Sequence, residues 1–227
     1  MITWSGNCVI KTWIGSIVDA NAEVTTNAAN RDLLLGSNVA AAFNAAAGPQ
    51  LQRECNQIMD ELRKKGFNSI PDGLAVLTTS GAMQGPTKAI CHAVGPMLPV
   101  ANRRNPTDDQ KFRLLSSYTK CIYLAQSNGY TSIAFPFIGT GVFGWNLRLG
   151  QIIALQAALT APVLKHGGPE LTNELTEKLK EKSYDRGIIH VAIGKEPRVA
   201  AEQTLVSCVK KAIAIAERNR FRSLVFF

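Results

Sequence analysis

Short apolar, β-branched runs alternate with longer segments of helical periodicity along the 227 residues of the chain. This alternation predicts a three-layer α/β/α sandwich with a largely parallel or mixed central sheet. The predicted strands are Cys8–Trp13, Glu23–Thr26, Leu74–Thr79, Lys88–Val94, a run that starts at Ser132, and Ile188–Ile193. The predicted helices are Val39–Ala47, Gln50–Lys65, about Asp108–Asn128, about Asn146–Leu164, Glu170–Lys182 and Arg198–Asn219. No repeat or long linker divides the chain, so we expect a single domain over 1–227, with a core at about 4–164 completed by 188–220.

A glycine-rich loop follows the strand that starts at Ser132. Gly139, Gly141 and Gly144 remove side chains where the loop turns, so that backbone N–H groups can close on an anion such as phosphate before the next helix. The spacing G-x-G-x-x-G also suggests a dinucleotide-binding fold. That fingerprint belongs in the first βα turn, with an acidic residue about 20 positions later. Here it follows the fifth predicted strand, which disfavours the dinucleotide interpretation.

The charge balance favours an anionic partner without identifying it. The chain carries 25 Lys and Arg against 17 Asp and Glu, a net charge of +8. Most of the basic runs fall on predicted helices, where a solvated surface is the simpler interpretation than a nucleic-acid groove. The five cysteines show no C-x-x-C pairing, and we expect them to be buried reduced thiols. No motif calls for a metal or a cofactor.

No apolar run approaches the length of a membrane span, and the first residues lack the pattern of a secretion signal. We therefore expect no membrane association and a cytoplasmic or, alternatively, a nuclear location.

Several short motifs occur together in one order. They are Gly15–Ile17, Asn27-Ala-Ala-Asn30, Gly36-Ser-Asn-Val39 before an Ala-rich helix, Ala46–Gly48, Cys91-His-Ala-Val-Gly-Pro96, and Ser132–Pro136 followed by Gly139-Thr-Gly-Val-Phe-Gly144. In this combination the chain resembles a macro domain, the module that binds ADP-ribose. Ala46–Cys55 and the stretch from Ser132 look most similar to macro domains attached to poly(ADP-ribose) polymerases.

The resemblance implies a diphosphate held between two backbone cradles, one at Gly36–Val39 and the other at Gly139–Phe143, the latter at a helix N-terminus. It implies that Asn30 binds the distal ribose through its carboxamide and that Phe143 packs beside that ribose. The implied ligand-binding residues are Ser16, Ile17, Asn27, Asn30, Gly36, Ser37, Asn38, Val39, Ile138, Gly139, Thr140, Gly141, Val142, Phe143 and Ile193.

Four departures from the family pattern point to weakened ligand chemistry. Ser16 replaces an Asp that accepts a hydrogen bond from adenine, and Ser37-Asn38 replaces two glycines of the first cradle. Ala40 stands where the MacroD-type hydrolases carry the Asp that handles the catalytic water. Ile193 lies near the position of an aromatic residue that stacks on adenine.

Three functions remain open. The leading one is binding of ADP-ribose or of ADP-ribosylated protein. The second is removal of ADP-ribose from acidic side chains, an activity that would rely on Asn30 and Phe143 to position the ligand and its water. The third is binding of poly(ADP-ribose), RNA or another nucleic acid by the basic surface.

Four of these side chains have competing roles. Asn27 could orient its loop instead of contacting ligand, and we expect His92 to be a satisfied core histidine. Trp145 is expected to pack rather than to stack on a base, and the Thr140 hydroxyl is a candidate phosphate contact.

Overall fold

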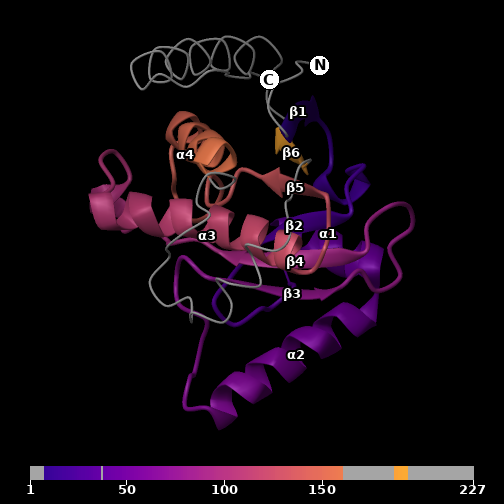
Figure 1. Cartoon of the computed structure of the whole chain (residues 1–227). Coiled ribbons are helices and arrows are strands. Elements are labelled where there is room, and N and C mark those ends of the chain that lie inside the picture. Colours follow the sequence, from indigo (N-terminus) through magenta and orange to yellow (C-terminus); the bar gives the residue numbers. More distant parts are fainter. Residues whose placement is uncertain (1–7, 37, 161–186, 194–227) are drawn as a thin grey trace, which may run out of the picture.

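The computed structural model describes residues 8–36, 38–160 and 187–193 (Figure 1). They form a six-stranded sheet with the order β1-β6-β5-β2-β4-β3. The strands are β1 (Cys8–Ile14), β2 (Val24–Ala29), β3 (Ala75–Thr79), β4 (Ala89–Val94), β5 (Ser132–Pro136) and β6 (Gly187–Ile193). Every neighbouring pair is parallel except β3 and β4, which are antiparallel. The predicted mixed sheet is confirmed.

The helices cover both faces of this sheet. They are α1 (Asn38–Ala47), α2 (Pro49–Lys64), α3 (Asp108–Ser127) and α4 (Leu147–Thr160), with short 3₁₀ helices at Ile17–Asp19 and Val100–Asn102. None of the helices in the described ranges is long and apolar enough to cross a membrane. The predicted helices Glu170–Lys182 and Arg198–Asn219 lie outside the described residues.

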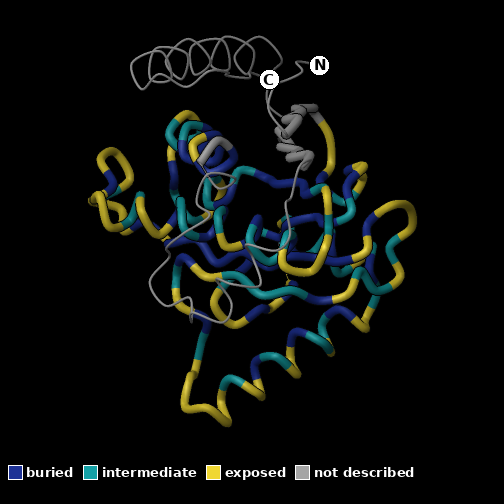
Figure 2. The backbone as a smooth tube through the Cα atoms, viewed as in Figure 1, coloured by how far each residue is buried: buried dark blue, intermediate teal, exposed yellow. Residues whose placement is uncertain are grey.

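Side-chain alternation along β4 builds two separate cores. Ala89, Cys91 and Ala93 point into a cluster shared with α3 and α4, whereas Ile90 and Val94 point into a cluster shared with α1 and α2. The strand is buried along its whole length, as Figure 2 shows for the centre of the sheet. This two-sided burial explains the continuous apolar run that parallel strands require, and it completes the three layers expected from the sequence.

The strand boundaries correct one prediction. Asn27-Ala-Ala was interpreted as a loop of small residues, but β2 continues to Ala29 and Asn27 is fully buried within it. The Asn27 amide nitrogen finds a partner across the sheet, because Nδ2 lies 3.1 Å from Nδ1 of His92 on β4, whereas Oδ1 is buried without a hydrogen-bond partner among the described residues. A buried amide with a partner is compatible with a central strand.

The cysteines and the charged helix faces agree with the predictions where they are described. Cys55, Cys91 and Cys121 are buried free thiols. Exposed pairs along α2 and α3 join Arg63 to Asp60 and Lys111 to Asp108, as expected for solvated helix surfaces.

One carboxylate joins the N-terminal ends of three strands. Glu23, just before β2, accepts hydrogen bonds from the backbone N–H and hydroxyl of Thr131, at 2.7 and 2.8 Å, and pairs with Lys88. Its own N–H donates to the Ser132 hydroxyl on β5 at 2.9 Å. Hydrogen bonding from Lys88 and from Thr131 lowers the pKa of Glu23 to about 2. Glu23 therefore fixes the N-terminal ends of β2, β4 and β5 relative to one another.

Replacing Glu23 with Gln is expected to lower the free energy of unfolding at pH 7 by about 1–3 kcal/mol, the range for hydrogen bonds to charged groups. Because the folded pKa lies below the ordinary value of 4.5, the stabilisation is complete above pH 4.5 and is lost as the pH falls towards 2. Urea unfolding of both proteins across this range checks the prediction. A stability difference that does not shrink between pH 4.5 and 2 would contradict it.

Candidate functional site

The C-terminal ends of β1, β6, β5, β2 and β4 lie at one edge of the sheet, because these five strands run parallel. The chain leaves neighbouring strands there in opposite directions. After β2 it passes to α1 and α2 on one face, and after β5 it passes to α4 on the other. In open α/β sheets, ligands bind in a crevice at such a topological switch point, between the two departing loops. The predicted cradles Gly36–Val39 and Gly139–Phe143 fall within these two loops, residues 30–39 and 137–145.

The first loop ends directly at the start of a helix. α1 begins at Asn38, so the first N–H groups of that helix have no acceptor within it, and its first turn carries no acidic residue. A Cβ added at Gly36 would meet no atom within 4 Å, which shows that the backbone there faces open space. Asn38 has a φ of 52°. Asparagine tolerates this left-handed conformation better than most residues, so it can replace glycine in this cradle. Ser37 lies outside the described residues.

The second loop presents backbone donors of its own. Within the described part of the chain, the N–H groups of Gly139, Gly141, Val142 and Phe143 donate to no protein acceptor. A Cβ at Gly141 would meet nothing within 4 Å. α4 begins only at Leu147, and the Asn146 side chain accepts from Leu149 N–H at 3.2 Å. The donors of this cradle are therefore those of the loop, and the helix N-terminus expected here lies instead at the first loop.

Packing beneath the second loop fixes its shape. Trp145 is buried and donates from Nε1 to the Pro96 carbonyl at 2.7 Å, which confirms its packing role. The Thr140 hydroxyl donates to the Phe137 carbonyl at 3.0 Å, so its proton is not free for a phosphate. Tyr118 of α3 accepts from Ile138 N–H at 2.7 Å and donates to the Pro136 carbonyl at 3.3 Å. Burial raises the pKa of Tyr118 above its ordinary value and keeps the hydroxyl protonated.

Replacing Tyr118 with Phe is expected to lower the free energy of unfolding by about 1–3 kcal/mol, because the Ile138 N–H is left buried without an acceptor. Tyr123 of α3, whose ring lies 5.5 Å from Lys120 Nζ, provides the matched control. Tyr123→Phe removes the same hydroxyl from a partly exposed position and should change stability little. Chemical denaturation of the two variants checks the prediction, and equal effects would contradict it.

Asn30 shapes its own loop. Its Oδ1 accepts from the N–H groups of Asp32, at 3.0 Å, and Leu34, at 3.1 Å, while its Nδ2 donates to the Leu34 carbonyl at 2.7 Å. Leu33 inside this turn has a φ of 54° and is fully buried. One N–H of the Asn30 amide remains for a ligand, so contact with a ribose stays a prediction. The sequence offered the Asn at the start of a turn as a signal for this local role.

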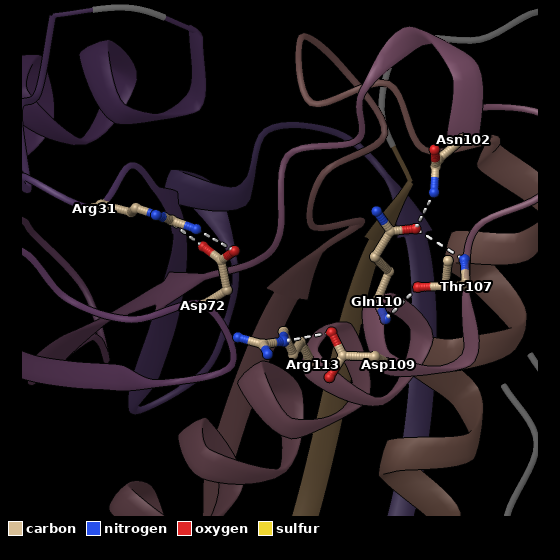
Figure 3. A network of polar contacts seen from close by, with 7 residues as sticks. All are labelled: Arg31, Asp72, Asn102, Thr107, Asp109, Gln110 and Arg113. Atoms are coloured by element: carbon tan, nitrogen blue, oxygen red, sulfur yellow. Dashed lines mark hydrogen bonds and ion pairs between the residues drawn. The ribbon is translucent and has the colours of Figure 1, made fainter.

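Arg31 holds the same turn to the segment that precedes β3. Its Nε donates to Asp72 Oδ1 at 2.8 Å, and its second nitrogen binds the other carboxylate oxygen (Figure 3). The Arg31 carbonyl also accepts from Ile70 N–H at 2.9 Å. Such a two-point pair fixes orientation as well as distance. Sequence reasoning missed this pair, because nothing in the local pattern links positions 31 and 72.

His92 is a core residue, as predicted. It is fully buried, and it lies between Asn27 and Thr78, whose hydroxyl oxygen is 3.0 Å from Nε2. Because the Asn27 amide nitrogen donates to Nδ1, the ring proton resides on Nε2. Burial lowers the pKa of His92 to about 4, so the ring is neutral at pH 7. Asn27 thus has the structural role that was one of its two alternatives.

The remaining predicted positions surround the same edge. Ser16 is exposed, and its side chain does not cap the 3₁₀ helix that follows it, whereas Ile17 is buried. Ala40 is buried in α1 and provides no proton acceptor. Ile193 ends β6 next to β5, and its side chain lies outside the described residues, as does that of His190.

A second hollow lies away from this edge. A groove of about 820 Å³ runs between α2 and β3 and is lined by Gln50, Arg53, Glu54, Gln57, Ile58, Glu61, Leu62, Lys65 and Leu77. Its two carboxylates are balanced by Arg53 and Lys65, and Glu54 is already bound to the Thr79 N–H and hydroxyl. The groove therefore offers no excess of positive charge to attract a diphosphate.

The macro domain family model matches residues 26–154, which contain both loops. The chain belongs to the macro domain family. It is 32% identical over 177 residues to an O-acetyl-ADP-ribose deacetylase of Enterobacter cloacae, covering 78% of this chain and 87% of that protein. A macro domain-containing protein of Listeria monocytogenes is 37% identical over 141 residues, or 62% of this chain and 73% of that protein.

Solved macro domains share the fold. The Oceanobacillus iheyensis macrodomain with ADP has a TM-score of 0.71 at 27% identity, covering 94% of this chain and 96% of that one. A variant of the same macrodomain with ADPR has a TM-score of 0.70 at 27% identity, covering 94% and 98%. The resemblance to macro domains inferred from the short motifs is thereby confirmed.

Proposed function

We propose that this macro domain binds ADP-ribose, free or attached to protein, in the crevice between the loops 30–39 and 137–145. One observation carries the proposal. At the switch point of the sheet, one loop leads into the first turn of α1, whose N–H groups have no acceptor within the helix. The other loop presents the N–H groups of Gly139, Gly141, Val142 and Phe143, which donate to no acceptor among the described residues. A diphosphate satisfies both sets at once. The macrodomain structures with ADP and ADPR support this choice of ligand.

The positions of the adenine and of the distal ribose follow from the residues at the two ends of the crevice. We place the adenine towards Ser16, Ile17 and Ile193, and the distal ribose between Asn30 and Phe143. Ser16 offers an uncharged acceptor, so adenine selectivity should be weaker than with a carboxylate.

Isothermal titration calorimetry tests the proposal with ADP-ribose, ADP and AMP. ADP-ribose and ADP should give saturable heats, and AMP should bind more weakly because it lacks the second phosphate. Gly141→Val, which fills open space beside the free N–H groups, should weaken ADP-ribose binding by about tenfold while leaving the fold intact. No saturable heat from wild type with ADP-ribose at about 1 mM would contradict the proposal.

Ester hydrolysis is the second candidate, favoured by the relatives named O-acetyl-ADP-ribose deacetylase. Ala40 supplies no general base, so water would have to be positioned by Asn30 and Phe143. Release of acetate from O-acetyl-ADP-ribose, and of ADP-ribose from an automodified acidic protein, should then be lost in Asn30→Ala. Release by wild type and variant that both equal the background without protein would exclude this activity.

Recognition of poly(ADP-ribose) or RNA by surface charge has less support. Arg103 and Arg104 form no ion pair among the described residues, but six other basic side chains are paired with acidic ones: Arg31, Arg63, Lys64, Lys88, Lys111 and Arg113. We therefore favour ADP-ribosylated protein as the partner. A steep fall of affinity with salt for a protein-free polymer would favour the polyanion instead.

A further inference from the structure

The segment 96–104 packs against the glycine loop 137–145. Leu98 N–H donates to the Phe143 carbonyl at 2.9 Å, and the Pro96 carbonyl accepts from Trp145 at 2.7 Å. A Cβ added at Gly144 would lie 2.5 Å from Nε of Arg103, so the Arg103 side chain lies directly on the glycine loop. The segment 96–104 is thus continuous with the crevice at the end where Phe143 stands.

This segment is held in place from its other side as well. Asn102 Nδ2 donates to Gln110 Oε1 at 3.2 Å, and the same oxygen accepts from Thr107 N–H at 2.8 Å (Figure 3). The Thr107 hydroxyl accepts from Gln110 N–H, which completes a capping box at the start of α3. The loop is therefore presented in a defined shape, which lowers the entropic cost of binding a partner there.

The outward side of the segment combines basic and apolar side chains. Arg103 and Arg104 are exposed, and neither takes part in an ion pair of the described residues. In contrast, the acidic side chains at the start of α3 are already paired with Lys111 and Arg113. Met97, Val100 and Val142 are 56%, 79% and 63% exposed. We refer to Met97, Val100, Arg103, Arg104 and Val142 as the carrier face.

We propose that the carrier face binds the acidic polypeptide segment to which the ADP-ribosyl group is attached. The inference rests on the proposed function, which places the distal ribose at Phe143 and so directs the attached chain towards this face. The guanidinium groups of Arg103 and Arg104, which form no ion pair within the described part of the chain, favour carboxylates as partners. The exposed side chains of Met97, Val100 and Val142 favour a partner with apolar side chains. A polypeptide has such side chains, whereas a polymer of ADP-ribose does not.

Two matched peptides test the proposal, each carrying one ADP-ribosyl group through a non-hydrolysable link. They share the same apolar residues, but one has Asp and Glu around the modified position and the other has Asn and Gln. Wild type should bind the acidic peptide about fivefold more tightly, since each exposed pair contributes about 0.2–1 kcal/mol. The double variant Arg103→Gln, Arg104→Gln should lose this preference, whereas Arg53→Gln, Lys65→Gln at α2, which removes two exposed positive charges elsewhere, should keep it.

Titration with free ADP-ribose distinguishes a failure of the proposed function from a failure of the carrier-face proposal. If wild type does not bind free ADP-ribose, the proposed function fails before the carrier face is tested. If wild type binds it, equal affinity for the two peptides overturns the carrier face, and so does a preference that survives in the double variant. A protein-free oligomer of ADP-ribose that gains more affinity from the two arginines than the acidic peptide does would identify the polymer as the partner and also overturn the proposal.

Discussion

Replacing Gly139 with alanine is expected to lower the free energy of unfolding by about 2–5 kcal/mol and to abolish ADP-ribose binding. Gly139 has a φ of 81°, where an L-residue costs about 1–3 kcal/mol. The added Cβ would also lie 2.6 Å from Cδ1 of Trp145. The indole cannot withdraw easily, because it is buried and bound to the Pro96 carbonyl. Relief requires the loop itself to move, and its free N–H groups move with it.

Gly141→Ala is the matched control in the same loop. Its Cβ would meet no atom within 4 Å, and its φ lies outside the left-handed region, so stability should stay within about 0.5 kcal/mol of wild type. Thermal unfolding and ADP-ribose titration of both variants separate the two effects. A Gly139→Ala protein as stable as Gly141→Ala would contradict the packing described beneath the loop.

Replacing His92 with leucine is expected to lower the free energy of unfolding at pH 7 by about 1–3 kcal/mol, because the Asn27 amide loses its buried acceptor. The pH dependence of the free energy of unfolding tests whether His92 is held neutral in the core. The folded pKa of about 4 lies below the ordinary 6.5, so the unfolded chain binds the proton more readily between these values. Wild type should lose about 3 kcal/mol as the pH falls from 6.5 to 4, and the variant should lack this component.

Stability curves of wild type and His92→Leu between pH 7 and 3.5 check the prediction, and the two curves should converge as the pH falls. Glu23→Gln is the control, because the stabilisation by Glu23 is lost in a different window, from pH 4.5 to 2. Parallel curves for wild type and His92→Leu would show that His92 is not held neutral in the core.

The strands, the helices and the two glycine loops could be predicted because their signals are local. Apolar runs mark the buried strands, and glycines mark the loop that faces open space. Asn27 was misplaced in a loop because its partner, His92, lies 65 positions away. The same limit hid the Arg31–Asp72 pair, which spans 41 positions. Contacts of this kind depend on which segments the fold brings together, and a local sequence pattern does not predict that arrangement.

The candidate site divides in the same way. The family motifs predict both cradles, but the helix N-terminus predicted for the second lies beyond Gly139–Phe143, since α4 begins at Leu147 and Asn146 caps it. The turn at Asn30 shows why single residues are harder to assign. A carboxamide suits a ribose and a backbone turn equally well, and only the positions of Asp32 and Leu34 reveal that most of its hydrogen bonds are internal.

The most direct test of the switch-point crevice is an amide ¹H–¹⁵N titration with ADP-ribose. The resonances of Gly36, Asn38, Gly139, Gly141 and Phe143 should shift together and saturate, because their N–H groups gain phosphate acceptors. Those of Gln57, Glu61 and Leu77, around the groove between α2 and β3, should not move. Saturating shifts confined to that groove, or no shifts at about 1 mM ligand, would contradict the account.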